Sequence, residues 1–171
     1  MTSEQMKEIL APSKPHMTIE QMKEMLTPGR APNADSGEPT VLTSALAYAS
    51  MGWHVLPLKA RSKVSLVRWK AGATTDPAVI RSWWEKWPDA GVAIAVEPSK
   101  LVAVDGDDPS VEADLDLPET LTAATGRGQH FYYQAPEGVA LKSWSGPGFD
   151  VKATGYVVAP PSIHPTGVRY K

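Results

Sequence analysis

Two aspartates separated by one glycine, Asp105 and Asp107, follow the apolar run Leu101–Val104 and have clear chemical potential. Side chains alternate along a strand, so carboxylates at positions i and i+2 project from the same face and converge. Two negative charges that lie so close raise each other's pKa unless a cation sits between them. The pair therefore either binds Mg²⁺ or Mn²⁺ or spreads apart into water.

A glycine-containing loop, Thr125–Gln129, leads into His130 at the start of another apolar run. Glycine lets the backbone approach a ligand closely, and a histidine at such a junction can donate to a phosphate oxygen. The alternative interpretation is a glycine turn next to a histidine that already has its own partner.

A third carboxylate, Asp150, lies inside the apolar segment Phe149–Lys152, which we predict to be a strand. A buried aspartate without a partner is costly. Asp150 must therefore face a cation, a base or a hydrogen-bond network.

The composition is that of one soluble domain: 171 residues, 42% hydrophobic, 21% charged, with a net charge of −2. The absence of cysteine excludes a thiol nucleophile, a cysteine-ligated zinc site and disulfide bonds. No apolar run approaches the roughly 20 residues of a membrane span, and the N-terminus lacks the apolar region of a signal peptide. We therefore expect a cytoplasmic protein with no membrane partner.

Charge is distributed unevenly along the chain. Residues 59–70 contain five basic and no acidic residues, whereas residues 105–119 contain seven acidic and no basic residues. The first segment could bind phosphates and the second a metal ion. The alternative is a pair of solvated loops of opposite sign.

The N-terminal 39 residues contain an internal repeat, because Glu4–Glu8 recurs as Glu20–Glu24. Each copy resembles a short amphipathic helix that ends at a proline. Helices this short are marginal unless they dock on something. The repeat is therefore either a docking pair of helices or a duplicated start region without function. We assign residues 1–39 to an extension and residues 40–171 to the folded domain.

Apolar spacing predicts a helix from Val41 to Gly52, and Asp76-Pro77 is a typical start for a second helix that ends near Trp87. Its three tryptophans are expected to pack on the core rather than stack on nucleic-acid bases. We predict six strands: Trp53–Leu58, Val92–Val96, Leu101–Val104, His130–Gln134, Phe149–Lys152 and Tyr156–Ala159. The second and third should form a hairpin. The expected class is α/β (α+β), with a mostly antiparallel mixed sheet flanked by helices.

Several motifs occur together in one order: Gly52–Leu58, Lys63, Ala73–Pro77, Val104–Asp107, Thr125–His130, Gly148–Lys152 and Gly155–Gly167. With these motifs the chain resembles, over roughly residues 45–170, the primase-polymerase (Prim-Pol) domain of the archaeo-eukaryotic primase superfamily. Such domains stand at the N-terminus of plasmid and phage replication proteins. The resemblance implies a primase-like catalytic core.

The resemblance also implies roles for individual residues. Asp105, Asp107 and Asp150 correspond to the family's catalytic carboxylates, which hold divalent metal, Mg²⁺ or Mn²⁺. His130 corresponds to the catalytic histidine, which contacts the phosphates of the incoming nucleotide. Four further residues are expected to reach that nucleotide: Lys63, Lys152, Ser162 and His164.

The activity that follows from the resemblance is template-directed nucleotidyl transfer from nucleoside triphosphates in DNA replication. Expected partners are single-stranded DNA template and primer, together with a helicase domain or protein. One alternative is a nucleotide- or DNA-binding module that is catalytically incompetent without segments beyond Lys171. Another is a metal-dependent phosphohydrolase built on a similar set of residues.

Overall fold

The computed structural model describes residues 39–107 and 117–171. The repeated N-terminal segments and most of the acidic run lie outside the described residues. The described residues form three helices and eight strands. In chain order these are α3 (Val41–Ser50), β1 (Val55–Leu58), α4 (Trp69–Gly72), α5 (Pro77–Lys86), β2 (Gly91–Ala95), β3 (Leu101–Gly106), β4 (Leu121–Ala124), β5 (Gln129–Gln134), β6 (Trp144–Gly146), β7 (Phe149–Lys152) and β8 (Tyr156–Ala159).

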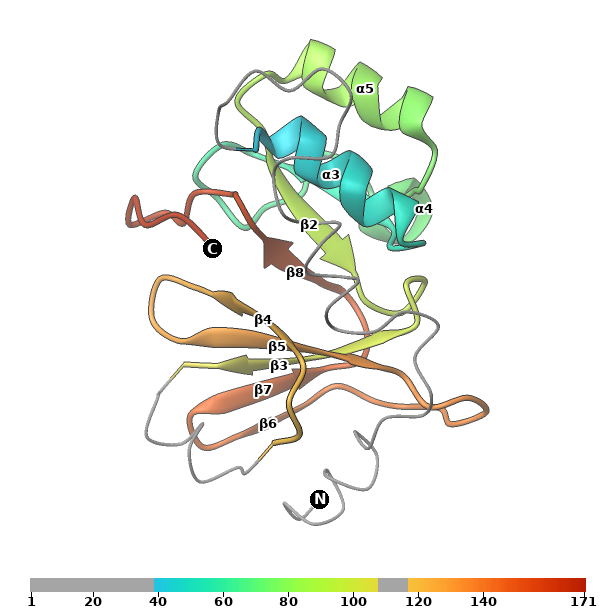
Figure 1. Cartoon of the computed structure of the whole chain (residues 1–171), viewed down its shortest axis with the longest axis vertical. Helices are drawn as coiled ribbons and strands as arrows, with labels where there is room; N and C mark the ends of the chain where they lie inside the picture. Colours follow the sequence, from blue (N-terminus) through green and yellow to red (C-terminus); the bar gives the residue numbers. More distant parts are fainter. Residues whose placement is uncertain (1–38, 108–116) are drawn as a thin grey trace.

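The strands form two separate sheets (Figure 1). The smaller sheet has the order β1-β2-β8, and the larger sheet has the order β4-β5-β3-β7-β6. Every strand pairing among the described residues is antiparallel. The α+β class is therefore confirmed, whereas the single mixed sheet is replaced by two antiparallel ones. Helices α3 and α5 pack against the smaller sheet, and in the view of Figure 1 they lie above the larger sheet.

Both long helices begin where the sequence predicts. Thr40 caps α3 by accepting a hydrogen bond from the Thr43 amide, and Asp76 caps α5 by accepting one from the Ala78 amide, with Pro77 in the first turn. Each of these helices has ten residues. No helix in the described parts of the chain is long and apolar enough to cross a membrane.

The tryptophans of α5 belong to the core, as expected. Trp83 and Trp84 are buried, and the indole nitrogen of Trp84 donates to the Ala90 carbonyl oxygen at 3.1 Å. Trp87 is half-buried against the same cluster, and the Lys86 ammonium lies over its ring. Trp83 and Trp84 are therefore not available as a platform for bases.

The predicted hairpin of Val92–Val96 with Leu101–Val104 is wrong. β2 pairs with β1 and β8, whereas β3 pairs with β5 and β7, so the two strands are central in different sheets. The short turn between them, with Lys100 in the left-handed region, carries the chain from one sheet to the other. Both strands are apolar because both faces and both edges are covered.

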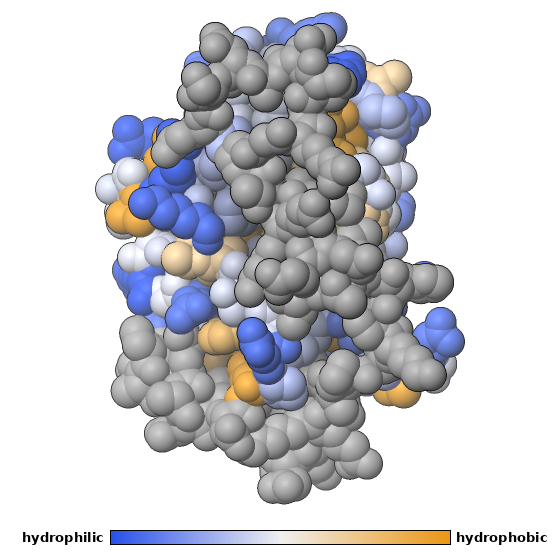
Figure 2. All heavy atoms as spheres, viewed as in Figure 1, coloured by the Kyte–Doolittle hydropathy of each residue, from blue (hydrophilic) through white to orange (hydrophobic). Residues whose placement is uncertain are grey.

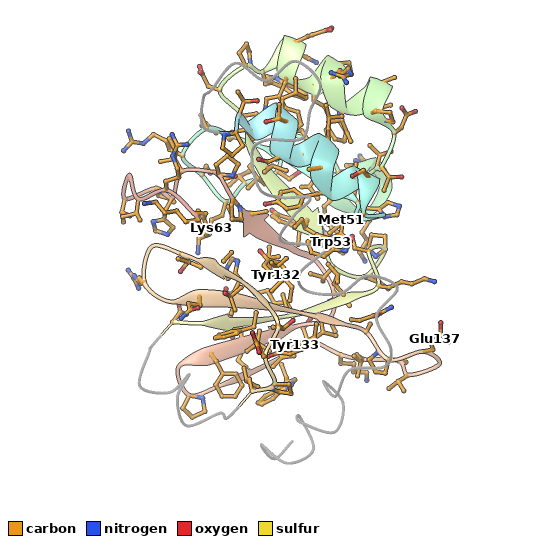
Figure 3. The ribbon with its side chains drawn as sticks, viewed as in Figure 1. Met51, Trp53, Lys63, Tyr132, Tyr133 and Glu137 are labelled. Atoms are coloured by element: carbon orange, nitrogen blue, oxygen red, sulfur yellow. The ribbon has the colours of Figure 1, made fainter. Side chains whose placement is uncertain are left out.

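Stacked aromatic rings connect the helical layer to the larger sheet. Trp53 lies between Tyr48 of α3 and Tyr132 of β5, with ring centroids 5.9 and 5.8 Å apart. Tyr132 and its neighbour Tyr133 point to opposite faces of β5, Tyr132 toward Trp53 and Tyr133 away from it (Figure 3). The larger sheet is therefore covered by apolar groups on both faces.

The two adjacent tyrosines allow a matched test of this packing. The hydroxyl of Tyr132 is buried without a hydrogen-bond partner among the described residues, whereas that of Tyr133 donates to the Pro118 carbonyl oxygen at 2.8 Å. We expect Tyr133→Phe to lower the free energy of unfolding by about 1 kcal/mol and Tyr132→Phe to leave it unchanged or raise it. Urea denaturation measures both, and an equal loss in the two variants would contradict the assignment.

Candidate active site

Asp105 lies on the central strand of the larger sheet, and both neighbouring strands place a chemically active residue directly opposite it. His130 of β5 is its register partner on one side, and Asp150 of β7 is its partner on the other. Directly opposed residues in an antiparallel pair project from the same face. Three residues that are 20 or more positions apart in sequence therefore form one row across β5, β3 and β7.

The Asp105 carboxylate is engaged at both oxygens. His130 Nε2 lies 3.2 Å from Oδ1, and Lys152 Nζ lies 3.1 Å from Oδ2. Burial opposes the charged form of Asp105, but the hydrogen bond and charge of His130, together with Lys152, outweigh it and hold its pKa well below the ordinary value. A cation beside this carboxylate was one of the two alternatives predicted from the sequence, and Lys152 of the protein itself supplies one.

A cavity of about 250 Å³ opens at the end of β3. It is lined by Lys63, Asp105, Asp107, Thr125, Gly126, Arg127, His130, His164 and Tyr170. The cavity therefore combines two carboxylates with two permanently charged basic side chains and two histidines. Hydrophilic side chains gather on the side of the molecule where the C-terminal segment and the β4–β5 turn lie (Figure 2).

His164 is held with one ring nitrogen fixed. Its Nδ1 accepts the Thr166 amide at 3.2 Å, so in the neutral ring the proton is on Nε2. Burial lowers the pKa of His164, and the charges of Lys63 and Arg127 lower it further. A methyl group on Gly126 would lie 3.1 Å from the His164 ring. The glycine that the sequence suggested for ligand approach thus makes room for this histidine.

Tyr170 is a site residue that the sequence did not reveal. Its ring lies between His130 and His164, with centroid distances of 5.8 and 6.0 Å. Burial raises the pKa of Tyr170 to about 12, and the charges of Asp105 and Asp107 add to this effect. Arg127 was likewise not assigned a role, although it stands in the glycine loop. No local pattern marks Tyr170, because its position depends on the C-terminal segment pairing with β4 through Ala124 and Lys171.

Three of the residues expected at the site do not line the cavity. Ser162 is buried, and its hydroxyl accepts the Val92 amide at 2.8 Å and donates to the Val92 carbonyl oxygen at 3.0 Å. That hydroxyl anchors the segment that carries His164 to β2. Lys152 contacts Asp105, and Asp150 lies opposite Asp105 outside the cavity lining.

The donor set suits a hard divalent cation. Within residues 39–107 and 117–171, no three His, Asp or Glu side chains form a group that could hold a metal ion. Mg²⁺, however, is commonly bound through one or two carboxylates together with substrate phosphates. Asp105 and Asp107 in one cavity meet that requirement, whereas Asp150, although opposite Asp105 in the sheet, does not line the cavity.

Comparison with protein families identifies the class. The family model described as "Bifunctional DNA primase/polymerase, N-terminal" matches residues 45–171. The chain therefore belongs to the Prim-Pol family, and the match covers the whole of both sheets and the cavity. No curated protein matches the chain.

The ion pairs of Asp105 predict a pH-dependent contribution to stability. Because its pKa is lowered on folding, the contribution is present above the ordinary value of about 3.9 and is lost as the pH falls toward the folded-state value. In chelator, wild type should be more stable than Asp105→Asn at pH 7, with a difference that shrinks below about pH 4. Urea denaturation from pH 7 to pH 3 measures it, and a pH-independent difference would argue against the ion pairs.

Proposed function

We propose that this domain is a metal-dependent DNA primase/polymerase that transfers nucleotides from nucleoside triphosphates to a growing strand. The proposal is carried by the single cavity in which Asp105 and Asp107 face Lys63, Arg127 and the two histidines. A triphosphate with its divalent cation needs both an anionic and a cationic subsite within a few ångströms. Membership of the Prim-Pol family supports the same reaction.

Phosphate recognition is assigned to the basic side of the cavity. Lys63 and Arg127 supply permanent positive charge, and both are exposed and free to move toward a ligand. His164 adds a neutral donor at Nε2, because its Nδ1 is occupied by Thr166. His130 is fixed by Asp105 and by neighbouring rings, so it holds the Asp105 carboxylate in position at the edge of the cavity.

In the reaction, the 3′-hydroxyl oxygen of the primer attacks the α-phosphorus of the triphosphate. The new O–P bond forms as the bond to the β-phosphate oxygen breaks, pyrophosphate leaves, and the hydroxyl proton passes to solvent. Bound Mg²⁺ or Mn²⁺ would lower the pKa of the hydroxyl and neutralise the leaving oxygens. Asp105 and Asp107 hold the anionic side of the cavity, and Lys63 and Arg127 orient the leaving group.

Incorporation on a primed single-stranded template tests the proposal. Asp105→Asn and Asp107→Asn should each reduce primer extension on the order of a hundredfold, since each removes a charge from the reacting centre. Extension of a labelled primer with Mn²⁺ or Mg²⁺ measures the rate, and the released product distinguishes pyrophosphate from inorganic phosphate.

Glu137→Gln is the matched control, because Glu137 is exposed and lies on the opposite side of the molecule from Lys63 in the view of Figure 3. Its extension rate should equal that of wild type. Metal-dependent triphosphate binding without any extension would point instead to a binding module. Release of inorganic phosphate would favour the phosphohydrolase alternative.

The basic side chains of the cavity lead to a separate prediction about nucleotide affinity. Lys63→Gln and Arg127→Gln should each weaken dATP binding by about tenfold or more, because each removes one charge-assisted hydrogen bond. Calorimetry with Mn²⁺ present measures the dissociation constants. Lys142→Gln, an exposed lysine outside the cavity, should bind dATP like wild type, and a loss of similar size in this control would mean that net charge alone is responsible.

A further inference from the structure

The two side chains that contact the Asp105 carboxylate differ in how freely they can leave it. The Lys152 side chain is 32% exposed, whereas that of His130 is only 5% exposed. The His130 ring also packs against Tyr132 and Tyr170, with centroid distances of 6.2 and 5.8 Å. No ring contact or second ion pair is seen for Lys152 among the described residues.

From this asymmetry we infer that Lys152 is a displaceable counter-ion, which occupies Asp105 in the metal-free protein and leaves it when a divalent cation binds. This inference rests on the proposed function, because it assumes that Asp105 is a metal ligand. It assigns Lys152 to the control of metal entry rather than to the nucleotide contact expected from the family resemblance.

The Lys152 ammonium and a divalent metal ion cannot both remain on the Asp105 carboxylate without an energetic cost. Lys152 Nζ lies 3.1 Å from Oδ2, and a magnesium ion binds a carboxylate oxygen at about 2.1 Å. An ammonium and a divalent ion on that oxygen would therefore lie within about 5 Å of each other and repel strongly in a partly buried site. Binding through the other oxygen meets His130, which is fixed in the sheet.

Lys152 also has a stabilising role in the metal-free protein. It stands two residues after Asp150 on β7, so both side chains project from the face that carries Asp105. Its charge offsets the repulsion between the two opposed aspartates. Removing it should therefore weaken the metal-free fold and strengthen metal binding, two effects of opposite sign that loss of packing alone would not produce.

The test measures Mn²⁺ binding without nucleotide, by calorimetry, in wild type, Lys152→Met, Lys152→Arg and Lys142→Met. We expect Lys152→Met to bind Mn²⁺ about two- to fivefold more tightly than wild type, the range set by a single partly exposed ion pair. Lys152→Arg, which retains the charge, should return affinity to near the wild-type value. Lys142→Met changes net charge equally but lies outside the site, and should match wild type.

Thermal unfolding in chelator supplies the second readout, in which Lys152→Met should melt below wild type and show the larger stabilisation by Mn²⁺. Lys152→Gln replaces Lys152→Met if the latter does not fold. Equal or weaker Mn²⁺ binding in the neutral variant, with wild type binding normally, would overturn the inference while leaving the proposed function intact. If neither wild type nor Lys152→Met binds Mn²⁺, or if Asp105→Asn binds it as tightly as wild type, the metal site itself would be removed and the inference with it.

Discussion

The rest of the site depends on one constraint, which is that a carboxylate on the central strand of a covered sheet must have its charge balanced. Asp105 cannot turn to bulk solvent, since strands flank it on both sides and its side chain is only 14% exposed. Its negative charge is stabilised from both neighbouring strands, by the contact with His130 of β5 and by the ion pair with Lys152 of β7. The antiparallel register that sets these pairs also brings Asp150 opposite Asp105, so charge compensation and the concentration of carboxylates arise from the same hydrogen-bond ladder.

A row of aromatic side chains holds the residues around Asp105 in place. Successive contacts join Tyr48, Trp53, Tyr132, His130, Tyr170 and His164. The row begins in the helical layer, crosses to the larger sheet and ends at the cavity. It fixes the planes of both histidines through packing and not only through hydrogen bonds. Lys63 and Arg127 at the same cavity are exposed and lack such ring contacts within the described residues, so the site combines two packed histidines with two exposed basic side chains.

The segments that were foreseen share a property: their residues carry a local signal. Both long helices begin at a side-chain cap followed by a regular apolar face, and β5, β7 and β8 are short runs rich in aromatic or β-branched residues. The elements that were not foreseen, α4, β4 and β6, have three or four residues each. They are stabilised by pairing or packing partners rather than by their own composition. The supposed β2–β3 hairpin failed for a related reason, because apolar runs show burial but not the partner that provides it.

The sequence by itself determined that carboxylates, a histidine and a basic segment exist with spacings typical of one family, and that Asp105 and His130 stand at the ends of predicted strands. The closeness of Asp105 to Asp107 follows from the sequence alone, because the two residues are two positions apart and side chains alternate along a strand. Only the tertiary structure decided which of the other residues meet there. Lys152 forms an ion pair with Asp105, and Ser162 hydrogen-bonds to the backbone of Val92. Arg127 and Tyr170 line the cavity. These outcomes depend on strand order, register and the return of the C-terminal segment to β4, which are fixed by long-range hydrogen bonds and by the burial of a shared core that no short window of sequence encodes.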